Sequence, residues 1–147
     1  MIAGRVAFQA AMRAASADLL AAYAVAASIR LQVYPARPAS LYPPTAFVDL
    51  IRESISYDGL RTRNVFAEVV VVHAEFDSKE AADQKDAFVD GFLDWVTDAV
   101  HGAGANTTVG VVETEDLPDY VPDWLPPEKQ RTYYATRLTL EGLSLSG

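Results

Sequence analysis

The residue types best suited to chemistry gather in residues 63–96, where one histidine stands among carboxylates. His73 and Glu75 are two positions apart, so they share a face of the predicted strand, while Glu68 lies on its other face. An imidazole beside a carboxylate can act as a general base or contribute to a metal site. Zinc needs three or four ligands, and the second histidine, His101, falls at the far end of the helix predicted next. This stretch therefore predicts no metal centre.

The remaining catalytic signals are weak. The chain has no cysteine, which excludes a disulfide framework, a thiolate zinc site and a cysteine nucleophile. No serine or threonine lies in a recognisable nucleophile elbow, and there is no glycine-rich phosphate loop. We expect neither catalytic residues nor a cofactor. A small oligomeric enzyme that uses His73 with Glu75 or Glu68 stays open as an alternative.

The chain is acidic, with 20 Asp and Glu against 12 Lys and Arg and a net charge of -8. Specific binding to nucleic acid needs a clustered excess of basic residues, so this charge argues against it. Five aspartates at steps of three or four residues form what we call the Asp ridge: Asp83, Asp86, Asp90, Asp94 and Asp98. The ordinary interpretation of this ridge is a solvated helix face. The alternative is a surface that repels phosphate or meets a basic partner.

Length and composition indicate one domain, residues 1–147, because 50% hydrophobic and 22% charged residues are typical of a soluble globular chain with one core. Charged residues interrupt the Ala-rich first thirty positions too often for a signal peptide or a membrane span. We predict a helix there instead, with Arg13, Ser16 and Asp18 off its buried stripe. That stripe comprises Phe8, Met12, Ala15, Leu19, Tyr23, Ala26 and Ile29.

A second helix is predicted from about Ser78 to His101. Asp77 and Glu80 have the spacing of a capping box at its start, and the glycines of "HGAGAN" stop it. Its buried stripe comprises Phe88, Phe92, Trp95, Val96 and Ala99.

Strand patterns fill much of the remaining sequence: "RLQVY", Thr45 to Tyr57, the valine-rich run up to Phe76, "TTVGVVETE" and "RTYYATRLTLEGLSLS". The apolar positions change parity near Leu50, which predicts a bulge or bend. The predicted fold class is α+β: a mainly antiparallel sheet of about four to five strands, with two long helices packed on it.

The valine-rich strand is apolar on both faces, and a sheet built around such a strand must be covered on both. Val65, Ala67, Val69 and Val71 share one face with His73, and Val70 and Val72 lie on the other. Either the two helices straddle the sheet, or another subunit covers one face.

A long projecting hairpin is predicted around the Asp58-Gly59 turn, with "YDGLRTRN" as its loop. Each arm of about 13 residues would reach roughly 43 Å, whereas a compact chain of this length is about 38 Å across. Arg61 and Arg63 at the tip are therefore candidate contacts to a neighbouring subunit.

A second contact candidate is the Pro-rich segment "DLPDYVPDWLPPEKQ", which carries Tyr120 and Trp124. Large aromatics on an exposed loop suit an interface. Equally, Trp124 could fold back onto its own domain.

The layout as a whole resembles the tail terminator (tail-completion) proteins of long-tailed bacteriophages. The resemblance lies in the N-terminal helix, in "VYPARPASLYPPTAFVDL" running into a strand, and in the strand-to-helix unit "VFAEVVVVHAEFDSKEAADQKDAFVDGFLDWV". It implies a structural virion protein at the tail neck, assembled in the host cytoplasm, which forms a hexameric ring. Such a ring caps the tail tube, ends polymerisation of the major tail tube protein and joins the tail to head–tail connector proteins. No catalytic residues come with this family.

The Asp ridge would suit the lumen of such a ring, because a negative wall does not hold the phosphates of passing DNA. No membrane partner is expected. Two other roles stay open: a neck or head-completion ring at the same junction, and a small oligomeric binding protein unrelated to virions.

Overall fold

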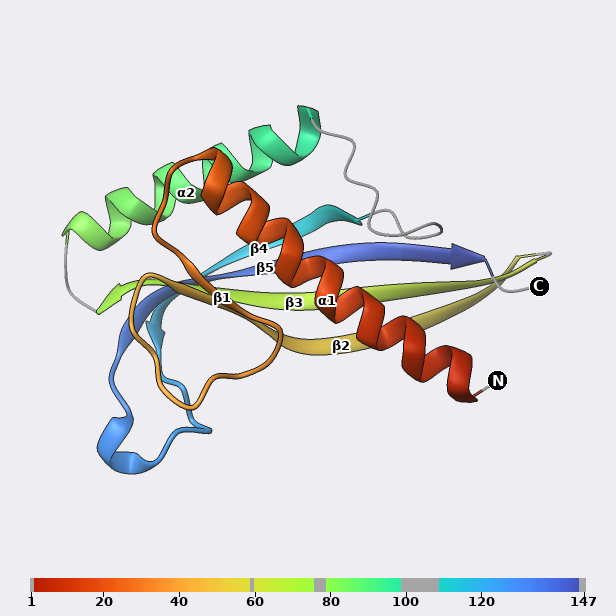
Figure 1. Cartoon of the computed structure of the whole chain (residues 1–147), viewed down its shortest axis with the longest axis horizontal. Helices are drawn as coiled ribbons and strands as arrows, with labels where there is room; N and C mark the ends of the chain where they lie inside the picture. Colours follow the sequence, from red (N-terminus) through yellow and green to blue (C-terminus); the bar gives the residue numbers. More distant parts are fainter. Residues whose placement is uncertain (1, 59, 76–78, 99–108, 146–147) are drawn as a thin grey trace.

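The chain folds as one five-stranded sheet with two helices, as seen in a computed structural model that describes residues 2–58, 60–75, 79–98 and 109–145 (Figure 1). The elements are α1 (Ile2–Ala26), β1 (Gln32–Tyr34), β2 (Thr45–Asp58), β3 (Leu60–Glu75), α2 (Lys79–Asp98), β4 (Val109–Tyr120), a 3-10 turn (Pro127–Lys129) and β5 (Tyr133–Leu145). The strand order is β1-β2-β3-β5-β4, and only the β1–β2 pair is parallel. The α+β prediction with a mainly antiparallel sheet is confirmed.

The predicted change of face in β2 is a β-bulge. Val48 pairs with Val69 and Leu50 with Glu68, so Asp49 is the extra residue. A bulge shifts the alternation by one position. Phe47 therefore lies opposite the helices, whereas Ile51 beyond the bulge packs on the helix side.

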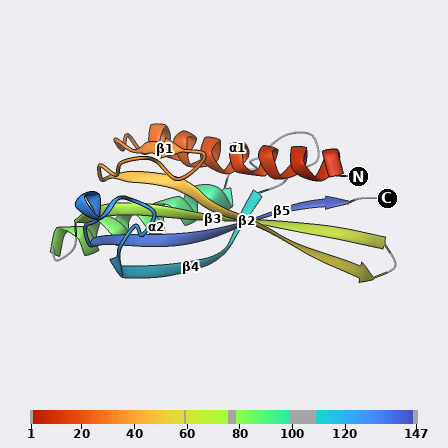
Figure 2. The ribbon, with the colours of Figure 1, turned by 90° about the horizontal axis from the view of Figure 1, so that it is seen from below.

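Both helices lie on one face of the sheet, which corrects the expectation that they might straddle it. Figure 2 shows α1 running along one side of the strands. The ring of Tyr23 in α1 lies 5.3 Å from those of Phe88 and Phe92 in α2, so the helices also contact each other. The helix-side core holds Met12, Leu20, Tyr23, Val48, Val65, Val69, Val71, Phe88, Phe92, Leu138 and Leu140, among others.

Loops of the same chain cover part of the other face, where the sequence left another subunit as the alternative. A second cluster, the loop-side core, is built from Leu41, Phe47, Val70, Val72, Leu125, Tyr133 and Ala135. Leu41 and Leu125 come from the Pro-rich segments 35–44 and 121–132. Apolar side chains from these two segments thus cover this part of the sheet, as the helices do on the other face.

Two local predictions are wrong. Ser16 is fully buried in α1. Its burial is possible because the hydroxyl donates a hydrogen bond to the carbonyl of Met12 at 2.8 Å. The hairpin loop is also much tighter than expected, since Asp58 pairs with Leu60 directly across position 59. Asp77, Ala99 and His101, expected at the ends of the second helix, lie outside the described residues.

Candidate functional site

Arg61 and Arg63 lie within strand β3 rather than in a loop. Arg61 pairs with Tyr57 of β2, and Arg63 pairs with Ile55 of β2 on one side and Ser144 of β5 on the other. The loop prediction for these arginines is wrong because Asp58-Gly59 is compatible with a longer loop, whereas β2 and β3 stay paired up to Asp58 and Leu60. The structure places the backbone of both arginines near the β2–β3 turn, and their side chains lie outside the part that it describes.

The aromatic loop folds back onto its own domain, which was the second of the two interpretations. The Trp124 indole donates from Nε1 to the carbonyl of Pro38 at 3.0 Å, and its ring lies 5.1 Å from that of Phe47. The Arg37 guanidinium stacks over the indole at 5.0 Å and also pairs with Asp49. These contacts tie segments 35–44 and 121–132 together, so Trp124 is a structural anchor.

Tyr120 belongs to the same group of side chains. Its ring lies 6.3 Å from that of Trp124 and packs against the loop-side core. Burial raises the pKa of its hydroxyl far above the ordinary value, and the carboxylate of Asp49 adds to the effect. Tyr120 is therefore neutral and half-buried.

The Asp ridge is solvent-exposed at Asp83, Asp86, Asp90 and Asp94. The side chain of Asp98 falls outside what the structure describes. One carboxylate of the ridge has a partner: Asp86 lies 2.5 Å from the ammonium of Lys85, which also lies 3.3 Å from Asp116 on β4. The exposure agrees with a solvated helix face.

His73 is buried beneath α2 and is 5% exposed. Its Nε2 atom lies 2.9 Å from Oγ1 of Thr136 on β5, and its ring meets that of Phe88 edge-on at 5.6 Å. The pKa of the imidazole is lowered to about 4, mainly by burial and next by the charge of Lys85, while the carboxylate of Asp116 acts to raise it. His73 is thus a neutral ring at pH 7.

The suggested pairing of His73 with Glu68 is wrong. Glu68 lies on the opposite face of the sheet, where its carboxylate is 3.7 Å from both Arg52 and Arg137. Arg137 also bonds Glu115 on β4 at 3.0 Å. These alternating charges cover part of the loop-side face, away from the loop-side core. The side chain of Glu75 lies outside the described residues.

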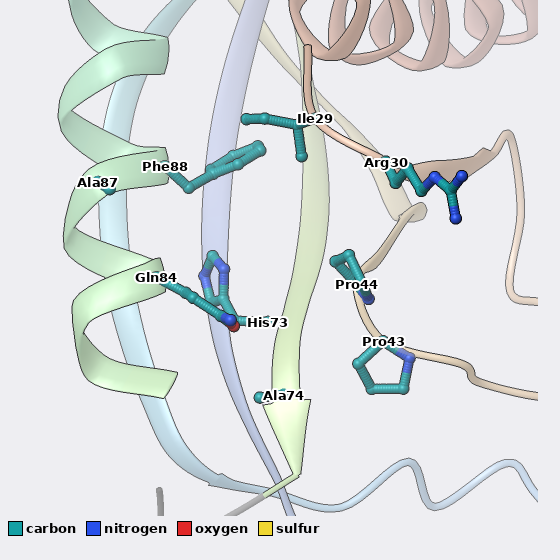
Figure 3. A pocket seen from close by; sticks show the side chains of 9 residues that line it. All are labelled: Ile29, Arg30, Pro43, Pro44, His73, Ala74, Gln84, Ala87 and Phe88. Carbon is teal, nitrogen blue, oxygen red and sulfur yellow. The ribbon is translucent and has the colours of Figure 1, made fainter. Parts of the chain in front are cut away.

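His73 lines a pocket of about 710 Å³, which we call the His73 groove. Figure 3 shows α2 forming one wall, the end of β3 the floor, and the segments around Arg30 and Pro44 the opposite wall. The lining residues are Ile29, Arg30, Pro43, Pro44, His73, Ala74, Gln84, Ala87 and Phe88. The peptide bond between Pro43 and Pro44 is cis.

The chemistry of the groove is mostly apolar with a few polar groups. Arg30 is the one charged residue among the described lining residues, and Gln84 supplies an amide from α2. Neither side chain makes a hydrogen bond or ion pair within the described part of the chain. The groove can therefore offer an amide and an imidazole nitrogen to a ligand that fills its apolar space, while the Arg30 side chain lies at its rim and extends away from α2 (Figure 3).

Comparison with known proteins gives the chain no family: no family model matches it, and no curated protein matches its sequence.

Within the described ranges, no three His, Asp or Glu side chains come together in a way that could hold a metal ion. Neither described helix is long and apolar enough to cross a membrane. Of the pockets among the described residues, the His73 groove has a larger volume than those around Asp116–Val121, about 300 Å³, and around Leu31 and Tyr42, about 420 Å³.

Sequence reasoning identified His73 but missed the other walls of the groove. The lining comes from four segments: 29–30, 43–44, 73–74 and 84–88. Their proximity depends on how α2 and the 35–44 segment pack, which periodicity does not report. Gln84 was the available signal, because Gln84 and Thr97 are the two uncharged polar side chains of a helix that is rich in aspartate.

Proposed function

We propose that this protein is a structural ring subunit of a long-tailed bacteriophage, a tail terminator that closes the tail tube and joins it to the head connector. The proposed ring is a hexamer and has no catalytic step of its own. The finer features that go with this role are two long helices on the sheet and a long hairpin that acts as a contact arm.

The observation that carries the proposal is the pairing of β2 and β3. The two strands run 14 and 16 residues and stay paired from Thr45–Val72 to Asp58–Leu60. Within the described residues, β5 accompanies β3 as far as the Thr62–Leu145 pair, and the pairs Tyr57–Arg61 and Asp58–Leu60 lie beyond it. In Figure 1 the joined ends of β2 and β3 lie at one end of the long axis. A neighbouring subunit can reach such an arm.

The outer edge of β2 supports the same role. β1 pairs with β2 only from Thr45 to Phe47, so from Val48 onward this edge has no strand partner within the described chain. Arg13 caps the carbonyl of Val48 at 2.9 Å. An unpaired edge can pair with another chain. A head-to-tail contact of this kind closes into a ring when its rotation permits.

Apolar burial supports a ring less than the sequence suggested. Loops and ion pairs of the chain itself cover much of the face that was expected to need a second subunit. The lateral contacts of the proposed ring therefore rest on the β2–β3 arm and the β2 edge.

Native mass spectrometry and negative-stain microscopy of the purified chain, alone and with isolated tail tubes, test the proposal. We expect closed rings of six copies, at least on the tube ends, and tubes that no longer elongate. A chain that stays monomeric in both settings would overturn the proposal. Rings that bind connector proteins but never tube ends would indicate the neck or head-completion role instead.

The His73 groove favours one further candidate, a small-molecule binding protein unrelated to virions, because its volume falls in the range of ligand pockets. A monomer that binds a ligand there and shows no affinity for tail tubes would select this function.

A further inference from the structure

The floor of the His73 groove is the end of β3. Val72 pairs with Thr45 in the last pair of the β2–β3 ladder, and Ala74 pairs with Tyr134 of β5 beyond a register shift at His73. An occupant also meets side chains from α2 and from residues 29–30 and 43–44.

The walls select an occupant with an apolar body. Six of the nine lining residues are apolar: Ile29, Pro43, Pro44, Ala74, Ala87 and Phe88. Phe88 is held by edge-on contact with Tyr23, and the two prolines have few accessible conformations. Rigid walls of this kind bind a flat or compact body without loss of side-chain entropy. In Figure 3 the side chains of Phe88 and Gln84 extend from α2 toward β3, and Ile29 and Pro44 lie on the other wall.

The charges around the groove select an anionic group. Arg30 is exposed on the wall opposite α2 and makes no ion pair within the described residues, although the chain carries an excess of carboxylates. Asp83 precedes Gln84 on α2 and is also exposed, so the two sides of the groove differ in sign. A negative group is attracted to the Arg30 side and repelled from the α2 side, which gives the ligand one preferred orientation.

We propose that the His73 groove is a binding site for a small organic anion, an aromatic or similarly compact apolar body with one carboxylate. The carboxylate lies at Arg30, and the apolar body lies between Phe88 and the Pro43–Pro44 segment. The neutral imidazole of His73 and the amide of Gln84 lie across the pocket from Arg30, where they can hydrogen-bond a polar substituent on the body of the ligand. This site is independent of ring formation and does not rest on it.

The test uses two probes of the same shape, 2-naphthoate and its neutral amide 2-naphthamide, with the folded full-length chain at pH 7.5. The imidazole resonances are followed by NMR, because the chain has only two histidines and a His73→Gln variant assigns them. We expect saturable shifts of the His73 signals with 2-naphthoate and a higher affinity for the acid than for the amide. No shift at millimolar 2-naphthoate would overturn the proposal.

Three variants locate the two parts of the ligand. Arg30→Gln should weaken 2-naphthoate about two- to fivefold, the range for an exposed ion pair, and leave 2-naphthamide unchanged. Arg131→Gln removes the same charge from an exposed position outside the groove and should change neither. Ala87→Trp places an indole in the groove and should abolish binding of both probes.

Circular dichroism and the melting temperature check that each variant is folded. If Ala87→Trp does not fold, Ala87→Leu tests the same space with a smaller side chain. Unchanged binding in the folded groove-filling variant would overturn the site, and an unchanged preference for the acid in Arg30→Gln would overturn the role of the anionic group.

Discussion

The hydroxyl of Tyr23 occupies the space where a side chain at position 91 would begin. A Cβ atom on Gly91 would lie 2.3 Å from this oxygen. The ring cannot move aside easily, because Phe88, Phe92 and Trp95 surround it at 5.3 to 5.5 Å. We predict that Gly91→Ala lowers the free energy of unfolding by about 1–3 kcal/mol from overpacking, although alanine favours a helix by about 1 kcal/mol. Chemical denaturation measures this change.

Tyr23→Phe supplies the control. The hydroxyl donates to the carbonyl of Phe88 only at 3.5 Å, so its removal costs little. Without it, the nearest ring atom, Cζ, is 3.5 Å from the added Cβ, which is ordinary contact. In this background Gly91→Ala should be neutral or stabilising. An equal loss in both backgrounds would show that the clash is not the cause.

His73 makes stability depend on pH. Its pKa is about 4 in the folded chain, mainly through burial, against about 6.5 when unfolded. Between these values the unfolded chain binds the extra proton, so stability rises with pH. The contribution is complete above about pH 6.5 and is lost as pH falls toward 4, on the order of 3 kcal/mol in total.

Urea unfolding at pH 7 and pH 5 in the parent and in His73→Gln measures this term. Carboxylates titrate in the same range, so the informative quantity is the difference between the two proteins. The parent should lose more stability than the variant on going to pH 5. Equal losses would mean that the imidazole is not buried in the neutral form.

At the scale of elements, the exposure of the Asp ridge indicates that substitutions in it do not strongly destabilise the fold. Asp90 and Asp94 are exposed and one helical turn apart, so their charges repel. We predict that Asp90→Asn with Asp94→Asn leaves the melting temperature unchanged or raises it by about 1–3 °C, since each removed repulsion is worth a few tenths of a kcal/mol.

Asp86→Asn is the contrasting variant, because Asp86 pairs with Lys85 and its loss should be neutral to slightly destabilising. A large loss of stability in the Asp90 and Asp94 variant would show that these carboxylates have structural partners, and the lumen interpretation would fail with it.

The local predictions succeeded where one rule decided them. The alternation of Val69 to Val72 placed side chains correctly on both faces of β3, and the parity change near Leu50 located the bulge at Asp49. What failed was decided by tertiary packing. No local pattern says that both helices share one face or that Trp124 finds the carbonyl of Pro38.

The same reason explains the groove. The local sequence pattern of each lining segment gives no sign of a pocket. Only the packing of α2 against β3 brings Gln84 near His73 and leaves space beside Pro44. The predicted length of the β2–β3 turn was wrong for a different reason. Asp58-Gly59 is compatible with both a tight turn and a longer loop, and the pairing of β3 with β5 favours continued pairing of β3 with β2.

For the whole molecule, each part of the surface has a distinct character. The helix side carries the exposed Asp ridge, and the loop side is covered by pinned Pro-rich segments and by ion pairs around Glu68. Within the described residues, the β2 edge beyond Phe47 has no strand partner, and β2 and β3 stay paired up to Asp58 and Leu60. The structural contribution of Trp124 leaves less of the aromatic loop for contacts than the sequence suggested.

The β2–β3 arm therefore carries the prediction for assembly. Arg61 and Arg63 stand near its turn on a chain with net charge -8, and arginine binds carboxylates and carbonyl oxygens of a partner well. We predict that Arg61→Glu with Arg63→Glu keeps the parent's circular dichroism spectrum and stability within about 0.5 kcal/mol, yet weakens ring formation or docking to tail tubes. Native mass spectrometry and tube-capping assays measure the loss.

Arg131→Glu is the matched control, because it changes an exposed arginine beyond the 3-10 turn and should leave assembly intact. Unfolding of the double variant would make the arginines structural, and Arg61→Gln with Arg63→Gln then repeats the test without reversing charge. If the folded double variant assembles as well as the parent, the arm makes no essential contact. Lateral contacts would then have to run along the edge of β2 that β1 leaves without a strand partner among the described residues.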